Sequence, residues 1–143
     1  MPYTETYASD RVQAFPGMVA DTSPATIVSR EAGADIAFGK AVVIDGATVR
    51  AFATGDTAID GISVRSQAIE AEADQYTSGV TAAVLKTGAM FVLAGEAVAF
   101  GDPVYVEGAT GDFVKTPTEN VAIPNARFEQ SAADGGLTII RIT

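Results

Sequence analysis

Short apolar runs broken by turn residues constrain the fold of this chain more than any other sequence feature. The runs are rich in valine, isoleucine, threonine and alanine, and turn signals such as Asp45-Gly46, Asp60-Gly61 and Lys86-Thr87-Gly88 separate them. Residues of the first kind favour strands, whereas glycine and proline interrupt them. No window of about 12 residues keeps the apolar spacing of an amphipathic helix. The pattern predicts an all-β sandwich or barrel from about residue 25 to residue 143.

The first 24 residues differ from the rest, because their large side chains are scattered among polar residues and prolines. Two interpretations remain open: a loose terminus, or an extended N-terminal arm that lies on a partner. On the second interpretation, residues 1–24 form the arm and residues 25–143 the β-sandwich domain. Removal of residues 1–20 should then leave the unfolding of the domain nearly unchanged and weaken partner binding. The candidate partner-interface residues are Tyr3, Tyr7, Arg11 and Phe15.

One segment of the chain recurs 62 residues later. Ala32–Val42 and Ala94–Val104 align without gaps, and six of their eleven positions are identical. The repeat predicts a glycine-bearing turn that enters a strand and is used twice in one sandwich; chance similarity in an alanine- and glycine-rich chain is the alternative. The phenylalanine of each copy should pack inward, so Phe38 and Phe100 are expected to be buried at equivalent places. Truncating either ring to alanine should then cost roughly 3–5 kcal/mol.

Residues that carry chemistry are scarce in this chain. It contains no histidine, cysteine or tryptophan, so the commonest general base and the thiolate ligands are missing. None of Lys40, Lys86 and Lys115 lies in a Ser-x-x-Lys spacing, and no Gly-Lys-Ser/Thr phosphate loop occurs. We therefore expect no enzymatic activity, no catalytic residues and no cofactor.

The densest acidic cluster comprises Glu70, Glu72 and Asp74. Alternate spacing would place the three carboxylates on one face of a strand, where they could hold a cation or support hydrolysis. A solvated edge or loop is the favoured interpretation, since like charges discourage strand addition and the Asp/Asn/Gly mixture of calcium loops is missing. No metal site is expected, and cation binding by this cluster is left open.

Charge and hydropathy limit the partners. The formal net charge is −9, and such an acid excess argues against binding nucleic acid or an anionic membrane through charge. The low aromatic content and the lack of tryptophan weaken a sugar-binding interpretation. No signal region is visible at the start, and no run approaches the ~20 apolar residues of a membrane span. These features are typical of a soluble structural or interaction protein made in a cytoplasm.

Five segments in a fixed order extend over nearly the whole chain. They are Ser23–Arg30, Gly61–Arg65, Lys86–Val92, Gly101–Val106 and Ile123–Phe128. Each is a turn plus a strand, so none is specific alone, but the ordered set resembles the capsid cement (decoration) proteins of tailed bacteriophages. The resemblance implies a small, jelly-roll-like β-sandwich bound to the outside of an icosahedral shell.

The resemblance also implies partners and a location. Such a protein would bind the major capsid protein and itself, as a homodimer or homotrimer, and would clamp neighbouring capsid subunits without an active site. It would be synthesised in the host cytoplasm and end on the outer capsid surface of the virion, away from the DNA phosphates. The alternatives are a β-sandwich binding module of a phage tail fibre or host-recognition protein, and a carboxylate-based hydrolase.

Overall fold

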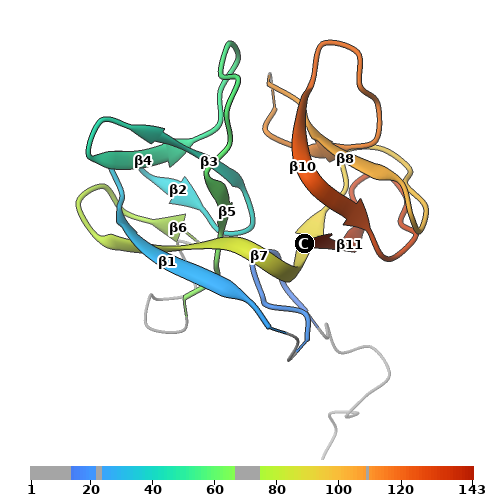
Figure 1. The fold of residues 1–143 in the computed structure, drawn as a ribbon, viewed down its shortest axis with the longest axis horizontal. Helices are drawn as coiled ribbons and strands as arrows, with labels where there is room; N and C mark the ends of the chain where they lie inside the picture. Colours follow the sequence, from blue (N-terminus) through green and yellow to red (C-terminus); the bar gives the residue numbers. More distant parts are fainter. Residues whose placement is uncertain (1–13, 22–23, 67–74, 109) are drawn as a thin grey trace, which may run out of the picture.

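The chain folds into strands and turns, as a computed structural model shows for residues 14–21, 24–66, 75–108 and 110–143 (Figure 1). The all-β fold class is confirmed, because these ranges contain antiparallel strand pairs and no helix, and hence no helix able to cross a membrane. The strands are β1 (Thr26–Glu31), β2 (Ile36–Ala37), β3 (Ala41–Asp45), β4 (Thr48–Ala51), β5 (Gly61–Ser63), β6 (Gln75–Tyr76), β7 (Thr81–Leu93), β8 (Pro103–Val106), β9 (Phe113–Val114), β10 (Val121–Phe128) and β11 (Leu137–Ile142).

A curled nine-stranded sheet and a two-stranded sheet of β2 and β6 form two lobes that share strand β7. The strand order is β4-β3-β5-β7-β11-β10-β8-β9, and β1 pairs with β7 beside this path. The first half of β7 pairs with β1 and β5, whereas its second half, from Gly88 to Leu93, pairs with β11. Figure 1 shows β1–β6 in a first lobe, β8–β11 in a second lobe, and β7 running between them. The arrangement is consistent with a small β-sandwich or half-barrel.

The long strand β7 corrects one sequence expectation. Lys86-Thr87-Gly88 was expected to be a turn between two strands, but all three residues lie within β7. Gly88 has a φ of 124°, which L side chains rarely adopt. The glycine therefore marks an irregular point inside one strand, where β7 passes from the first lobe to the second.

The two lobes repeat the same backbone arrangement. Ala32 forms a parallel bridge with Val49 in the first lobe, and Ala94 forms one with Phe113 in the second. The first bridge joins the end of β1 to β4, and the second joins the end of β7 to β9. Each lobe therefore curls back on itself. The glycine after each alanine donates its N–H at 2.8 Å to the same partner's carbonyl: Gly33 to Val49 and Gly95 to Phe113.

The turns predicted from the repeat are also equivalent in backbone. Gly39 and Gly101 have left-handed φ values of 74° and 91°, and each lies two residues before the start of the next strand, β3 or β8. Gly39 N–H donates to the carbonyl of Ser63, and Gly101 N–H donates to the carbonyl of Phe128. The repeat is therefore a real feature of the fold rather than a chance similarity.

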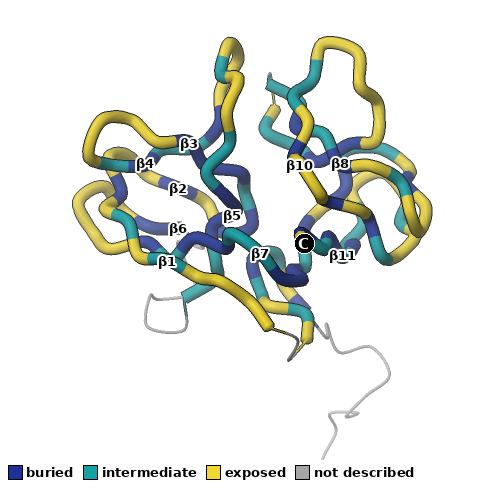
Figure 2. The backbone as a smooth tube through the Cα atoms, viewed as in Figure 1, coloured by how far each residue is buried: buried dark blue, intermediate teal, exposed yellow. Residues whose placement is uncertain are grey.

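The buried residues form two cores, and β7 contributes to both; Figure 2 shows buried segments in both lobes. The larger core contains Phe113 and Phe128 of the second lobe, and the smaller one contains Phe38 inside the first lobe. Val84 belongs to the smaller core and its neighbour Leu85 to the larger. Because both faces of this part of β7 are covered, its sequence is a continuous apolar run instead of an alternating one.

Part of the N-terminal stretch lies along β7. The pairing consists of three backbone hydrogen bonds: Gly17 N–H to Phe91 C=O at 2.8 Å, Phe91 N–H to Met18 C=O at 2.9 Å, and Ala20 N–H to Ala89 C=O at 2.9 Å. These bonds contradict the expectation that residues 1–20 can be removed without effect on stability. The division into an arm of residues 1–24 and a domain of residues 25–143 stays a prediction, because residues 1–13 and 22–23 lie outside the described part.

A buried carboxylate links three strands of the first lobe. The side chain of Asp60, just before β5, is 2% exposed and accepts hydrogen bonds from Lys86 of β7 at 2.6 Å and Arg30 of β1 at 3.2 Å. Burial alone would raise the pKa of Asp60, but the hydrogen bonds from the two cations outweigh it and hold that pKa below its ordinary value. The ionised carboxylate therefore stabilises the packing of β1, β5 and β7.

We expect Asp60 to make the fold sensitive to acid. Its folded-state pKa is lower than its unfolded one of about 4, so its contribution is present above that pH and is lost as the pH falls through the folded-state pKa. Asp60→Asn should destabilise the protein near neutral pH, and the gap to the wild type should close in acid. Urea unfolding at a series of pH values measures this gap. Asp134→Asn, at an exposed turn, is the matched control, and a gap independent of pH would contradict the prediction.

Candidate functional site

A groove where the N-terminal segment meets the first lobe gathers two aromatic rings around one guanidinium. The cavity measures about 220 Å³. The guanidinium carbon of Arg65 lies 4.7 Å from the ring centroid of Phe15 and 5.4 Å from that of Phe38. These distances are typical of cation–π contacts. Phe15 and Leu93 are 46% and 40% exposed, so the outer rim of the groove presents apolar surface to solvent.

Two glycines fix the position of Phe15 in this groove. Gly17 and Gly39 both have left-handed φ values, and their backbones touch: a Cβ on Gly39 would lie 2.7 Å from the nitrogen of Gly17. Glycine is required at such a close approach of two backbones. Arg65 N–H donates to the carbonyl of Gly17 at 2.7 Å, so the same turn places the arginine beside the ring of Phe15.

The expectation that Phe100 is buried was wrong. Phe38 is 4% exposed, but Phe100, at the equivalent position of the repeat, is 75% exposed. The ring of Phe38 packs edge-on against Tyr76, with centroids 5.0 Å apart. The equivalent pairs of the two lobes are Ile36 with Tyr76 and Val98 with Ala132. The second lobe thus has a methyl group where the first has an aromatic ring, and Phe100 stays uncovered.

The turn that carries Phe100 is held by hydrogen bonds on both sides of the ring. Ala99 N–H donates to a carboxylate oxygen of Asp102 at 2.9 Å, and Asp102 N–H donates back to the carbonyl of Ala99 at 3.1 Å. Gly101 N–H donates to the carbonyl of Phe128, a fully buried residue of β10. A large exposed ring on a fixed turn is typical of an anchor residue in a protein–protein contact, because little entropy is lost on binding.

Of the four residues expected at a partner interface, only Phe15 can be placed. Tyr3, Tyr7 and Arg11 lie outside the described residues, and so does the acidic cluster of Glu70, Glu72 and Asp74. Sequence reasoning missed Arg65 and the exposure of Phe100. No local sequence signal marks Arg65. The exposure of Phe100 could be expected only once Ala132 is known to lie opposite Val98.

A second concave region, of about 620 Å³, is acidic and lies beside β9. Its Glu96 accepts hydrogen bonds from the Thr116 hydroxyl at 2.8 Å and from the Lys115 and Thr116 N–H groups at 2.9 Å. The hydroxyl bond is the main cause that lowers the pKa of Glu96, against a smaller opposing effect of burial. The carboxylate therefore stays ionised and ties the loop after β9. No cluster of three possible metal ligands occurs among the described residues.

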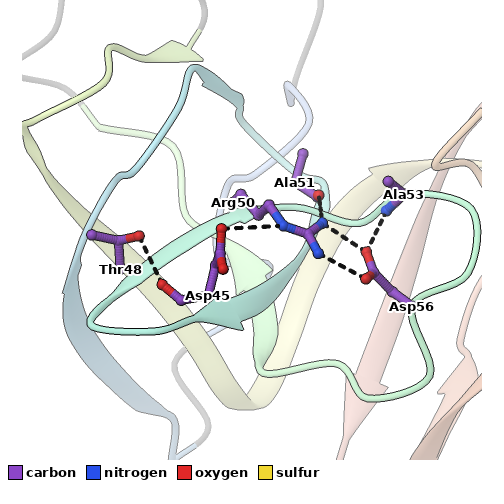
Figure 3. A network of polar contacts seen from close by, with 6 residues as sticks. All are labelled: Asp45, Thr48, Arg50, Ala51, Ala53 and Asp56. Atoms are coloured by element: carbon purple, nitrogen blue, oxygen red, sulfur yellow. Dashed lines mark hydrogen bonds and ion pairs between the residues drawn. The ribbon is translucent and has the colours of Figure 1, made fainter.

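Hydrogen bonds from the guanidinium of Arg50 hold the loop after β4 (Figure 3), as those to Glu96 hold the loop after β9. Arg50 donates two hydrogen bonds of 2.8 Å to the carboxylate of Asp56, which also accepts one from Ala53 N–H, and Asp45 lies 3.6 Å away. The hydrogen bond from Arg50 is the largest cause that lowers the pKa of Asp56. Each charge of this network has a partner within the loop and its hairpin, so the network serves the fold.

The fold and its surfaces define a class of protein. The carboxylates described above hold loops and strands in place, whereas the rings of Phe15 and Phe100 are exposed. The described residues therefore define a small all-β module with large aromatic side chains on its surface. The sequence matches the family of structural cement proteins (E217 gp24/Pam3 gp6) over residues 3–143, and the chain belongs to that family.

Two solved structures share the fold. A chain in the capsid of Myoviridae Phage XM1 superposes with a TM-score of 0.78 at 20% identity, over 97% of this chain and 98% of that one. The N base of head fiber gp8.5 in bacteriophage phi29 superposes with a TM-score of 0.54 at 16% identity, over 84% and 95% of the two chains. At these identities the likeness is one of fold. No curated protein sequence matches this chain.

Proposed function

We propose that this protein binds the outside of an assembled phage head and stabilises the contacts between neighbouring major capsid subunits. The match to the structural cement family over nearly the whole chain carries the proposal. The fold shared with a chain of the Phage XM1 capsid supports it. A net charge of −9 favours the outer surface over the inner wall, which faces DNA phosphates.

The mechanism requires binding energy and no chemical step. A protein that binds the assembled lattice but not its separated subunits stabilises that lattice by RT ln(1 + [L]/Kd) at each site. Many sites on one shell multiply a modest term into a large one. Phe15 and Phe100 offer contact area for the shell. The homodimer or homotrimer expected from the sequence would let one oligomer bind two or more capsid subunits at once. We infer no enzymatic activity, no nucleic-acid or membrane partner, and synthesis in the host cytoplasm.

The base of a fibre is the second candidate function. The fold shared with the base of the phi29 head fiber favours it over the tail-fibre and host-recognition modules that the sequence also allowed. A fibre base occupies a few positions on a particle, whereas a cement protein covers the lattice. Copy number therefore distinguishes the two functions.

We expect the purified protein to co-sediment with DNA-filled heads that lack it, and to saturate at a copy number comparable to that of the major capsid protein. The decorated heads should release DNA at a higher temperature than bare heads, because binding selects the assembled lattice. Sedimentation with quantitative gel densitometry measures the copy number, and a fluorescent DNA stain follows the release. Saturation at a few copies would indicate a fibre base, and no binding would contradict both functions.

A further inference from the structure

The outer edge of β1 has a counterpart in the second lobe. β1 leads directly into the bridge at Ala32, and the second half of β7 leads directly into the bridge at Ala94. The two strands therefore hold the same position in their lobes, at the offset of 62 residues seen in the sequence. On this basis Ile27–Ser29 of β1 corresponds to Ala89–Phe91 of β7.

In the second lobe, residues 17–20 cover this edge. Phe91 donates its N–H to the carbonyl of Met18 and accepts from Gly17 N–H, and Val19 forms an antiparallel bridge with Met90. The edge of β7 that faces away from β11 is thus completed by a strand-like piece of the N-terminal stretch.

In the first lobe, the backbone groups of Ser29 face the equivalent edge. Ser29 lies opposite Ala83 of β7, and the carbonyl of Ala83 accepts from Val64 N–H at 2.9 Å, on the side of β5. Opposed residues of an antiparallel ladder exchange either both hydrogen bonds or neither. Ser29 and Ala83 are therefore a non-hydrogen-bonded pair, and the N–H and C=O of Ser29 point away from β7.

This edge is open in the part of the chain that the structure describes. Thr26, Ile27, Ser29 and Glu31 are exposed, and the apolar side chain of Ile27 is 45% exposed. From Ile27 to Ser29, β7 is the one described strand that pairs with β1, whereas the next residues approach β4 through the bridge of Ala32 to Val49. An exposed strand edge with outward N–H and C=O groups is a template for the addition of another strand.

We propose that residues 1–13 of a second copy of this chain add to the outer edge of β1 as a strand. The segment precedes Ala14 and, at about 3.3 Å per residue, can extend about 40 Å beyond it. Pro2 is its one proline, so residues 3–13 keep every backbone donor, and its tyrosines, threonines and valine favour strands. Residues 17–20 of the same stretch already pair in this way with the equivalent edge of β7.

The exchange gives each copy one donated segment and one accepting edge. Reciprocal exchange between two copies closes a dimer, and exchange around a ring closes a trimer, so neither leaves an edge open to further growth. This inference concerns the contact between copies and does not depend on shell binding. It assigns Tyr3, Tyr7 and Arg11 to the interface within the oligomer.

The test blocks the edge without disturbing the ladder to β7. Ser29→Pro removes the outward N–H alone, since proline is tolerated on the solvent side of an edge strand, and Ser29→Ala is the matched control. A deletion of residues 1–13 removes the donated segment and leaves residues 17–20 on β7. Molar mass is measured by light scattering after size exclusion over a range of concentrations, and circular dichroism reports the fold.

The wild type and Ser29→Ala are expected to be oligomers. Ser29→Pro and the deletion should raise the dissociation constant of the oligomer at least about tenfold, with unchanged β-type spectra. If Ser29→Pro fails to fold, Ile27→Lys tests the same edge through an exposed charge. A monomeric wild type, or an oligomeric edge variant, overturns the inference.

A deletion that stays oligomeric while Ser29→Pro does not would also overturn it, because the edge would then be occupied by something other than residues 1–13. Sedimentation of each variant with undecorated heads is measured separately. Head binding by a monomeric Ser29→Pro protein would leave the proposed capsid function in place. If the oligomeric wild type and the oligomeric Ser29→Ala protein fail to bind heads, that failure would count against the capsid function alone.

Discussion

Phe38→Ala is expected to lower the free energy of unfolding by roughly 3–5 kcal/mol, and Phe100→Ala to change it by less than about 0.5 kcal/mol. The two rings hold equivalent positions of the repeat, but Phe38 is 4% exposed and packs against Tyr76, whereas Phe100 is 75% exposed. Truncation of Phe38 leaves a cavity in the core of the first lobe. Truncation of Phe100 removes surface that water already reaches. Urea unfolding of both variants measures the difference, and equal losses would contradict the unequal burial of the two rings.

The order of the two effects should be reversed for the affinity toward phage heads, where Phe100→Ala should have the larger effect. If the Phe100 ring is an anchor for the shell, Phe100→Ala should weaken head binding by about 2 kcal/mol, or roughly 30-fold in affinity. Folded Phe38→Ala protein should bind heads with nearly the wild-type affinity, because its ring is covered. Phe100→Tyr is a control that keeps the aromatic ring at the same exposed place. Unchanged binding of Phe100→Ala would place the shell contact elsewhere on the surface.

The strand content and the repeat could be predicted because both depend on local patterns. Runs such as Ala41–Ile44 and Leu137–Ile142 combine β-branched residues with flanking turn signals, and both became strands. The repeat at residues 32 and 94 fixes turns and bridges that involve the backbone, so its identical positions were sufficient to predict a shared turn. A turn whose backbone conformation depends on its own residues can be predicted from those residues alone.

The burial of side chains in the repeat could not be predicted in the same way. Whether Phe38 or Phe100 is covered depends on the residue across the lobe, and Tyr76 and Ala132 lie well beyond the repeated segment. The pairing of Gly17 with Phe91 was invisible for a related reason: it uses backbone groups, which leave no apolar pattern in the sequence. The N-terminal stretch therefore looked less attached than it is.

Gly39→Ala is expected to cost roughly 2–5 kcal/mol of stability, and Gly46→Ala about 1–2 kcal/mol. Both glycines have left-handed φ values, 74° and 63°, so both variants carry the penalty of about 1–2 kcal/mol for a Cβ in that region. At Gly46 a Cβ would meet nothing within 4 Å, whereas at Gly39 it would lie 2.7 Å from the nitrogen of Gly17. Forcing the two backbones apart adds about 1–3 kcal/mol. Chemical unfolding of the two variants under the same conditions isolates that second contribution.

Hydrogen exchange locates where the extra cost arises. The amide of Phe91 donates to the carbonyl of Met18, so it is protected as long as residues 17–20 lie on β7. Gly39→Ala should push Gly17 away and speed the exchange of that amide, while Gly46→Ala should leave its exchange close to that of the wild type. The groove should open at the same time, because Gly17 also accepts the hydrogen bond from Arg65 that places the guanidinium beside Phe15. Equal stability losses in the two variants, or an unchanged Phe91 amide in Gly39→Ala, would show that the contact between the two glycines does not hold the N-terminal segment in place.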